Sequence, residues 1–413
     1  MKLAKKFIVG ILSVLVVVLL FIVLQRLVMP KYDGSGDMPL EGNFTEEYYN
    51  ETTKHDVMMV GDCEVYENID TMYLWKNFGI TSYIRGNAQQ LTWQSYYMLE
   101  DTLKYETPKV LIYNVQALEH ATPQKETYNR MTLDGMKWSK TKWDAINTSM
   151  CDGENMLDYL FPILRYHSRI TSLTKNDIKY YFTPKQVSHN GYYMRIDVLP
   201  VSESDVADTD WIFGISSEKE EEENEIDDPW ADIDVSEDAV ADDGEIDDPW
   251  ADIDVGESAD GKEKDSNASA KTFGKLPMQY LDKMRKLCEK KGIKLLLMKA
   301  PSASPVWYEE EDRQIRDYAK KYGLDYINFY DLIDKIGLDY ETDTYDGGLH
   351  LNLQGADKLS EYLGKYLVEQ YQLPDHRKDS KIAGVYGEKL KFYEDMIKAQ
   401  QAELDKYGEI RSY

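Results

Sequence analysis

The chain is poor in the residues that build disulfide scaffolds and metal sites. It has three widely spaced cysteines, Cys63, Cys151 and Cys288, and only six histidines among 413 residues. This excludes a disulfide framework and disfavours a structural zinc site. Basic residues are also outnumbered, with 48 Lys and Arg against 75 Asp and Glu and a net charge of −27. Nucleic-acid binding needs clustered basic side chains, so we predict no nucleic-acid partner. We also predict no metal and no cofactor.

One long apolar run lies near the N-terminus. Residues 7–24 contain no charged side chain, and with residues 25–29 the run is long enough to cross a membrane. Lys2, Lys5 and Lys6 precede it, so we expect residues 1–6 in the cytoplasm and a body outside the plasma membrane on a single span. A cleaved signal peptide is the alternative, although no small-x-small cleavage site follows the run. Residues 30–54 are interpreted as a linker.

Most of the negative charge is concentrated in one segment. Residues 218–265 hold 23 acidic residues and three lysines, and they contain two copies of Glu-Ile-Asp-Asp-Pro-Trp-Ala-Asp-Ile-Asp-Val that begin at Glu225 and Glu245. So dense a charge cannot bury enough apolar surface to offset ordering, so we predict a disordered insert over residues 218–268. Weak cation binding and a short recognition element built on Trp230 and Trp250 are the alternatives.

The flanking sequence alternates between strand and helix patterns. Short apolar runs at 57–60, 81–84, 110–113, 294–298 and 326–329 predict buried strands, and spacings typical of helices occupy 64–78, 91–104, 277–291, 309–322 and 353–371. Such alternation predicts a three-layer α/β domain with a doubly wound parallel sheet, formed by residues 55–120 and 269–373. Residues 121–217 then form a long insertion after the third strand. Residues 374–413 form a C-terminal helical extension that docks on the domain or a partner.

Two motifs fall where ligands bind in such a sheet, at the carboxyl ends of strands. The first strand ends in Gly61-Asp62-Cys63-Glu64, which places Cys63 at the start of a helix whose dipole favours a thiolate. A late phrase, Asp343-Thr-Tyr-Asp346-Gly-Gly-Leu-His350, supplies a base for Cys63. Either Asp346 or Asp343 would orient its imidazole. The plainer interpretation makes Cys63 a packing residue.

Three further residues are candidates for substrate binding. Asp62 would contact substrate or merely cap the following helix. Lys299, at the end of the fourth strand, would bind an anionic substrate or remain a solvated strand end. Asn352 lies two residues after His350. Glu64 is interpreted as a first-turn acid favoured by the helix dipole.

These motifs resemble those of the SGNH/GDSL hydrolases. Gly61-Asp62-Cys63 is similar to the family's nucleophile motif with Cys in place of Ser, and Asp346 precedes His350 by four residues where the family has three. The resemblance assigns an oxyanion hole to the backbone of Cys63 and Gly86, with Asn114 in place of the family's absent Gly-x-Asn-Asp block. The phrase from His350 to Ala356 is similar to the closing motif of membrane-anchored SGNH-like proteins of Gram-positive bacteria.

This resemblance implies a function at the cell surface. The anchored relatives act beside membrane-bound O-acyltransferases in the acylation of cell-surface polymers. By that likeness the chain is an esterase or acyltransferase acting on O-acetyl-type esters of a surface polysaccharide, with Cys63 as nucleophile, His350 as base and Asp346 as orienter. The alternative is a catalytically silent SGNH-like domain that binds glycan or scaffolds an acyltransferase.

Overall fold

The computed structural model describes residues 2–30, 42–123, 125–183, 186–201, 272–303 and 307–411. The acidic insert predicted over residues 218–268 lies outside the described residues. The same holds for part of the predicted linker, at residues 31–41, whereas residues 42–54 are described.

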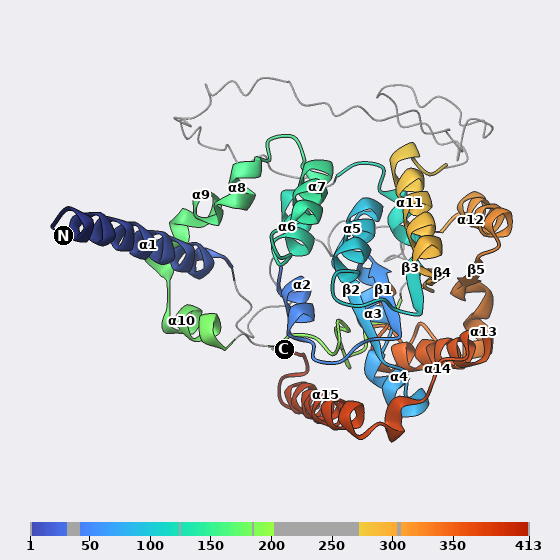
Figure 1. Cartoon of the computed structure of the whole chain (residues 1–413). Coiled ribbons are helices and arrows are strands. Elements are labelled where there is room, and N and C mark those ends of the chain that lie inside the picture. The colour runs from blue at the N-terminus through green and yellow to red at the C-terminus, as the bar shows by residue number, and fades with distance from the viewer. Residues whose placement is uncertain are drawn as a thin grey trace, which may run out of the picture.

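The core of the protein is a five-stranded sheet in which every neighbouring pair is parallel (Figure 1). Its strands are β1 (Val57–Gly61), β2 (Ser82–Gly86), β3 (Val110–Asn114), β4 (Lys294–Lys299) and β5 (Asp325–Asn328), in the order β2-β1-β3-β4-β5. The predicted α/β class with a parallel sheet is therefore confirmed. The order reverses between β1 and β3, and ligands of doubly wound sheets bind beside this point, outside the carboxyl ends of the strands.

Helices cover both faces of the sheet, because successive strand residues point to opposite sides. In β1, Val57 and Met59 pack on one face, and Met58 and Val60 pack on the other. The first face carries α3 (Cys63–Asn68), α4 (Thr71–Phe78), α14 (Leu353–Tyr371) and α15 (Ser380–Tyr407). The second carries α5 (Thr92–Thr102), α7 (Lys140–Ser149), α11 (Lys275–Lys291) and α12 (Glu309–Tyr322).

Most predicted helices agree closely with the structure, and 309–322 and 353–371 agree at both ends. The helix predicted over 64–78 is instead two helices, α3 and α4, separated by Ile69 and Asp70. Asp70 causes the break, because its carboxylate caps α4 by accepting hydrogen bonds from Met72 N and Tyr73 N at 2.7 and 2.8 Å. The same carboxylate accepts a hydrogen bond from the Tyr393 hydroxyl, which fixes α15 to this end of α4.

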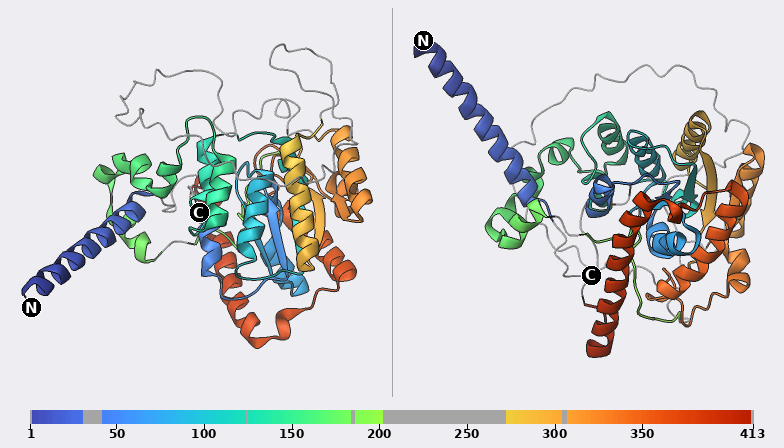
Figure 2. Two further views of the ribbon diagram at one scale, coloured as in Figure 1. Left: turned by 45° about the horizontal axis from the view of Figure 1, so that its top comes forward. Right: turned by 60° about the horizontal axis from the view of Figure 1, so that its bottom comes forward.

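The chain between β3 and β4 contains helices that the sequence analysis did not identify. They are α6 (Glu126–Leu133), α7, α8 (Met156–Leu160), α9 (Pro162–Tyr166) and α10 (Lys175–Phe182). Two further short helices are α2 (Asn43–Glu47) and α13 (Ile333–Ile336). Figure 2 shows α8, α9 and α10 in green beside one end of α1 and apart from the sheet.

Helix α1 (Lys2–Val28) projects from the body of the protein (Figure 2). Among the described residues it is the one helix whose length and composition suit a membrane span, from Lys6 to Val28. Its residues from Phe7 to Ile22 are exposed, unlike those of a core helix in a soluble domain.

Candidate functional site

Cys63 lies at the first position of α3, directly after the turn that leaves β1. Gly61 makes this turn possible, because its φ of 153° is a conformation that side chains disfavour. The Asp62 carboxylate accepts a hydrogen bond from Glu64 N at 3.2 Å, so Asp62 caps the helix. Gly86 at the end of β2 pairs with Gly61. A Cβ on Gly86 would lie only 3.1 Å from the carbonyl oxygen of Gly61, so this turn and strand end require close backbone approach.

Asp346, rather than Asp343, orients His350. Asp346 Oδ2 lies 2.6 Å from His350 Nδ1, and its Oδ1 accepts a hydrogen bond from the backbone N–H of His350 at 2.8 Å. Asp343 is fully buried and forms an ion pair with Lys358 at 2.6 Å. The four-residue spacing from Asp346 to His350 therefore supports the same carboxylate–imidazole contact that the shorter family spacing implies.

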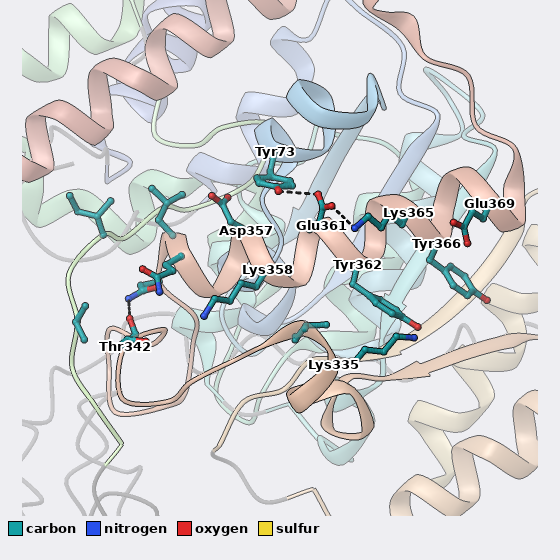
Figure 3. A pocket seen from close by; sticks show the side chains of 16 residues that line it. Tyr73, Lys335, Thr342, Asp357, Lys358, Glu361, Tyr362, Lys365, Tyr366 and Glu369 are labelled. Atoms are coloured by element: carbon teal, nitrogen blue, oxygen red, sulfur yellow. Dashed lines mark hydrogen bonds and ion pairs between the residues drawn. The ribbon is translucent and has the colours of Figure 1, made fainter.

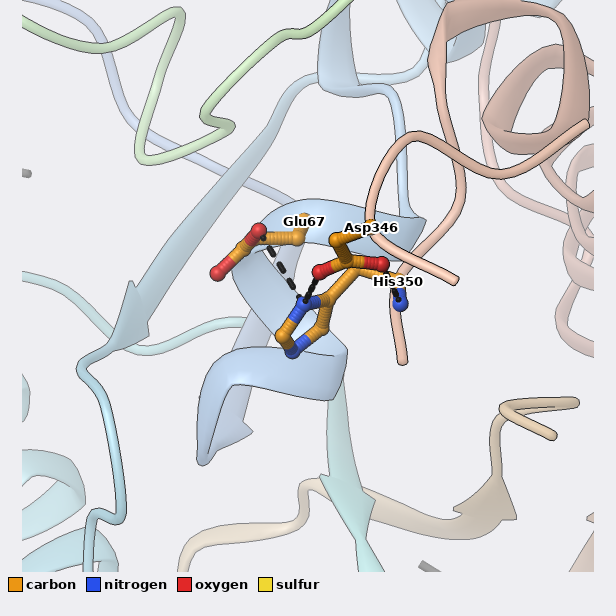
Figure 4. Close-up of side chains that lie close together, drawn as sticks. All are labelled: Glu67, Asp346 and His350. Carbon is orange, nitrogen blue, oxygen red and sulfur yellow. Dashed lines mark hydrogen bonds and ion pairs between the residues drawn. The ribbon is translucent and has the colours of Figure 1, made fainter. Parts of the chain in front are cut away.

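Glu67 is a member of this cluster that sequence reasoning missed. Its Oε2 lies 3.4 Å from His350 Nδ1, so two carboxylates face one ring nitrogen (Figure 4). Glu67 is itself 2% exposed and accepts a hydrogen bond from the Tyr345 hydroxyl. The available signal was spacing, because Glu67 follows Cys63 by four residues and thus shares its face of α3.

The imidazole of His350 interacts with the thiol of Cys63 and acts to lower its pKa. His350 Nε2 is nevertheless buried and has no hydrogen-bond partner of good geometry among the described residues. In this arrangement Nδ1 is held by carboxylates and Nε2 remains available to accept or donate a proton. This is the division of roles that a base in nucleophilic catalysis needs.

The protonation states differ from the sequence prediction. Burial raises the pKa of the Cys63 thiol to about 11, despite the opposing effect of His350. The dipole of α3 was predicted to favour a thiolate at Cys63, but burial outweighs this effect. Helix α3 is short, and the carboxylates of Asp62 and Glu67 also disfavour a negative sulfur. Burial would lower the pKa of His350, but Glu67 and Asp346 together raise it well above its ordinary value.

Lys299 and Glu64 form a buried ion pair beneath the Cys63 turn, which corrects both sequence interpretations. Lys299 Nζ lies 2.8 Å from Glu64 Oε1, and both side chains are almost inaccessible to solvent. Lys299 is therefore not a solvated strand end, and Glu64 is not simply an acid in a first helical turn. A substrate anion would have to displace Glu64 to reach Lys299. Burial and the nearby Glu64 carboxylate also raise the pKa of Asp62 to about 7.

The side-chain amides of Asn114 and Asn352 form hydrogen bonds within the protein. Asn114 Nδ2 donates to Asp62 Oδ1 at 3.2 Å and to Glu64 Oε2 at 2.9 Å, which leaves no amide hydrogen for a substrate oxyanion. Asn352 caps α14 through Gly355 N at 3.1 Å and donates to the Thr342 carbonyl at 2.8 Å. Asn352 therefore holds the loop that carries His350. Of the predicted oxyanion donors, the backbone N–H groups of Cys63, at the start of α3, and of Gly86, at the end of β2, remain as candidates.

The cluster of Glu67, Asp346 and His350 also has the composition of a metal site. Their ligand atoms all lie within 4.8 Å of one another. Ligands bound at about 2.0–2.1 Å in a tetrahedral zinc site are separated from each other by about 3.3 Å. The 2.6 Å between His350 Nδ1 and Asp346 Oδ2 is much shorter and is typical of a charge-assisted hydrogen bond. The geometry therefore favours a hydrogen-bonded dyad over a metal centre.

A large groove of about 890 Å³ follows α14 (Figure 3). It begins at Asn352, two residues after His350, and runs to Glu369. Acidic, basic and tyrosine side chains line it, including Asp357, Lys358 and Tyr362, but Cys63 and His350 do not. The groove is therefore close in sequence to the catalytic candidates without containing them.

Comparison with known proteins adds no assignment. No family model matches the chain, and a search of curated proteins finds no match.

Proposed function

We propose that this protein is an acyl-ester hydrolase or acyltransferase of the SGNH/GDSL type with a cysteine nucleophile. The observation that carries the proposal is the pairing of His350 Nδ1 with Asp346 at 2.6 Å, while Nε2 is unpaired among the described residues and the imidazole interacts with Cys63. The strand order and the position of Cys63 after β1 support the SGNH assignment, with residues 121–217 as an insertion into that fold.

The proposed reaction has two steps. The Cys63 thiol transfers its proton to His350, and its sulfur attacks the carbonyl carbon of the ester. The bond from that carbon to the polymer oxygen breaks, the released alkoxide takes the proton from His350, and a thioester remains on Cys63. Water, or an acceptor hydroxyl, then attacks the thioester while His350 takes its proton, and the thiol is restored. Backbone N–H groups at Cys63 and Gly86 would stabilise the oxyanion of each step.

The substrate proposal rests on the family resemblance and the apolar helix. If α1 is a retained anchor with residues 1–6 in the cytoplasm, the body faces the outer surface of the plasma membrane. An O-acetyl-type ester of a surface polysaccharide is then within reach, and a membrane-bound O-acyltransferase is the expected partner.

A second candidate is a catalytically silent SGNH-like domain that binds glycan or scaffolds such an acyltransferase. The raised pKa of Cys63, about 11, favours it, because the thiolate is scarce near neutral pH. The internal use of the Asn114 amide favours it as well, because the oxyanion hole then has one donor fewer.

Acyl transfer to Cys63 distinguishes the two. The full chain in detergent would be given p-nitrophenyl acetate, with ester turnover followed by absorbance and the Cys63 peptide examined by mass spectrometry. We expect a trapped acetyl thioester on Cys63, and a loss of about 10²- to 10⁴-fold in turnover on His350→Ala. Cys63→Ala should abolish turnover, whereas Cys151→Ala, at another partly exposed cysteine, should not. Turnover and adduct both absent in the wild type would favour the silent domain.

A further inference from the structure

Exposed apolar side chains gather in one part of the body. Among the described residues outside α1, nine aliphatic or phenylalanine side chains are exposed, and six of them lie between residues 157 and 182. Phe182 is 77% exposed and Ile178 is 54% exposed, both on α10. The six are Leu157, Leu160, Leu164, Ile170, Ile178 and Phe182. Single exposed apolar residues are common, but such a concentration marks an interaction surface.

This apolar segment is attached to the end of α1. The rings of Phe21 and Phe161 are 6.1 Å apart, and Gln25 Oε1 accepts a hydrogen bond from Ile163 N at 3.1 Å. Arg169 donates to the carbonyl of Val28 at 3.0 Å. Helices α9 and α10 therefore contact the C-terminal third of α1, and α8 packs against α9; Figure 2 shows the three helices beside this end of α1.

The level of this contact along α1 is informative. Exposed apolar residues of α1 run from Phe7 to Ile22, which is about 22 Å of helix at ~1.5 Å per residue. A hydrocarbon core is about 30 Å thick, so a span that starts at Phe7 ends near Arg26. Phe161 contacts α1 at Phe21, which lies within the part of α1 that the hydrocarbon core would cover. If α1 spans a bilayer, α8 and α9 consequently lie at its surface.

The charge of the segment fits such a surface. Residues 156–182 hold four basic residues, Arg165, Arg169, Lys175 and Lys179, against Asp158 and Asp177, in a chain whose net charge is −27. Asp177 is buried and paired with Arg169 at 2.9 Å. Lys175, Lys179 and Arg165 are exposed. Exposed apolar residues next to basic ones are typical of helices that lie in the headgroup region of anionic bilayers.

We propose that α8, α9, η3 (His167–Ser172) and α10 form a second membrane-binding element, which lies in the interface of the outer leaflet beside α1. This rests on the anchoring of α1 proposed above and not on the chemistry of Cys63. Together with α1, this element attaches the body to the bilayer at two places, which restricts rotation of the body about the single span.

Photolabelling from the lipid tests the proposal. The full chain would be reconstituted into phosphatidylcholine vesicles, with or without phosphatidylglycerol, that contain a lipid with a diazirine near the headgroup end of its acyl chain. We expect lipid adducts on peptides from α1 and from residues 157–182, and more of the latter with phosphatidylglycerol. Adducts on α1 alone would overturn the proposal and leave the anchor intact. An unlabelled α1 would overturn the anchor and this inference with it.

Matched variants sharpen the test. Ile178→Ser combined with Phe182→Ser should lower adduct formation on α10 severalfold, while Val368→Ser, at an exposed apolar residue of α14, should leave it unchanged. Lys175→Glu with Lys179→Glu should remove the added labelling that phosphatidylglycerol produces. Labelling of α10 that is unchanged in both double variants would contradict the proposal.

Discussion

Glu67 Oε2 lies 3.4 Å from His350 Nδ1, the nitrogen that Asp346 already holds at 2.6 Å. Two carboxylates on one imidazole favour its protonated form, and the pKa of His350 is raised accordingly. A protonated imidazole cannot accept the proton of a thiol. The site is therefore set for alkaline conditions, or for a substrate that displaces one carboxylate.

The reactivity of Cys63 should reflect this arrangement. With the pKa of its thiol raised to about 11, alkylation by iodoacetamide should rise with pH, with a midpoint above the ordinary thiol value of about 8.5. Glu67→Gln removes a carboxylate that raises the pKa of Cys63, so the midpoint should fall, by no more than about one pH unit. The rate is measured by mass spectrometry of the Cys63 peptide. A midpoint that Glu67→Gln leaves in place would show that Glu67 does not act on the pair.

Replacement of Lys299 should lower the free energy of unfolding. Lys299→Met leaves the Glu64 carboxylate buried without its cation, a change that costs about 3–5 kcal/mol of unfolding free energy. The double variant Glu64→Gln with Lys299→Met should recover most of this loss, because neither member of the pair then carries a charge. Urea unfolding followed by tryptophan fluorescence measures both. Lys286→Met, at a lysine that is 52% exposed, should cost no more than about 1 kcal/mol.

Asp357, which lines the groove beside α14, should make the stability depend on pH. Burial, together with Asp70, raises its pKa from 3.8 to about 8. An acid that is harder to ionise in the folded state stabilises the fold below its unfolded pKa. That contribution is lost as pH rises from about 4 to about 8. Asp357→Asn should therefore gain thermal stability relative to wild type across this range. A melting-temperature difference between the two proteins that does not change with pH would contradict this.

Gly86→Ala probes the turn that carries Cys63. The new Cβ would lie 3.1 Å from the Gly61 carbonyl oxygen and 3.2 Å from that of Asp62, so this backbone must shift. We expect a loss of about 1–3 kcal/mol in stability together with a changed alkylation rate of Cys63. The Cβ of Gly384→Ala on α15 meets no atom of the described residues within 4 Å, so this substitution should instead stabilise the helix by up to about 1 kcal/mol. Equal effects of the two substitutions would show that the Gly86 contact is unimportant.

Local pattern was enough to determine much of this protein. The strands at 57–60 and 110–113 are short apolar runs typical of buried strands, and their alternation with helices implies parallel pairing. Cys63 and His350 were identified because each stands in a motif near a predicted strand end or helix start. The apolar span at the N-terminus is likewise a property of composition alone.

Tertiary structure decided what each polar side chain does. Lys299 and Glu64 are 235 residues apart, and no local pattern indicates that both are buried and paired. Glu67 shares a helix face with Cys63, but its role depends on where the loop of His350 comes to rest. The choice of Asp346 over Asp343 depends on the same loop, because Asp343 is taken by Lys358. Long-range contacts determine burial, and burial in turn sets the charge state of the thiol and the imidazole.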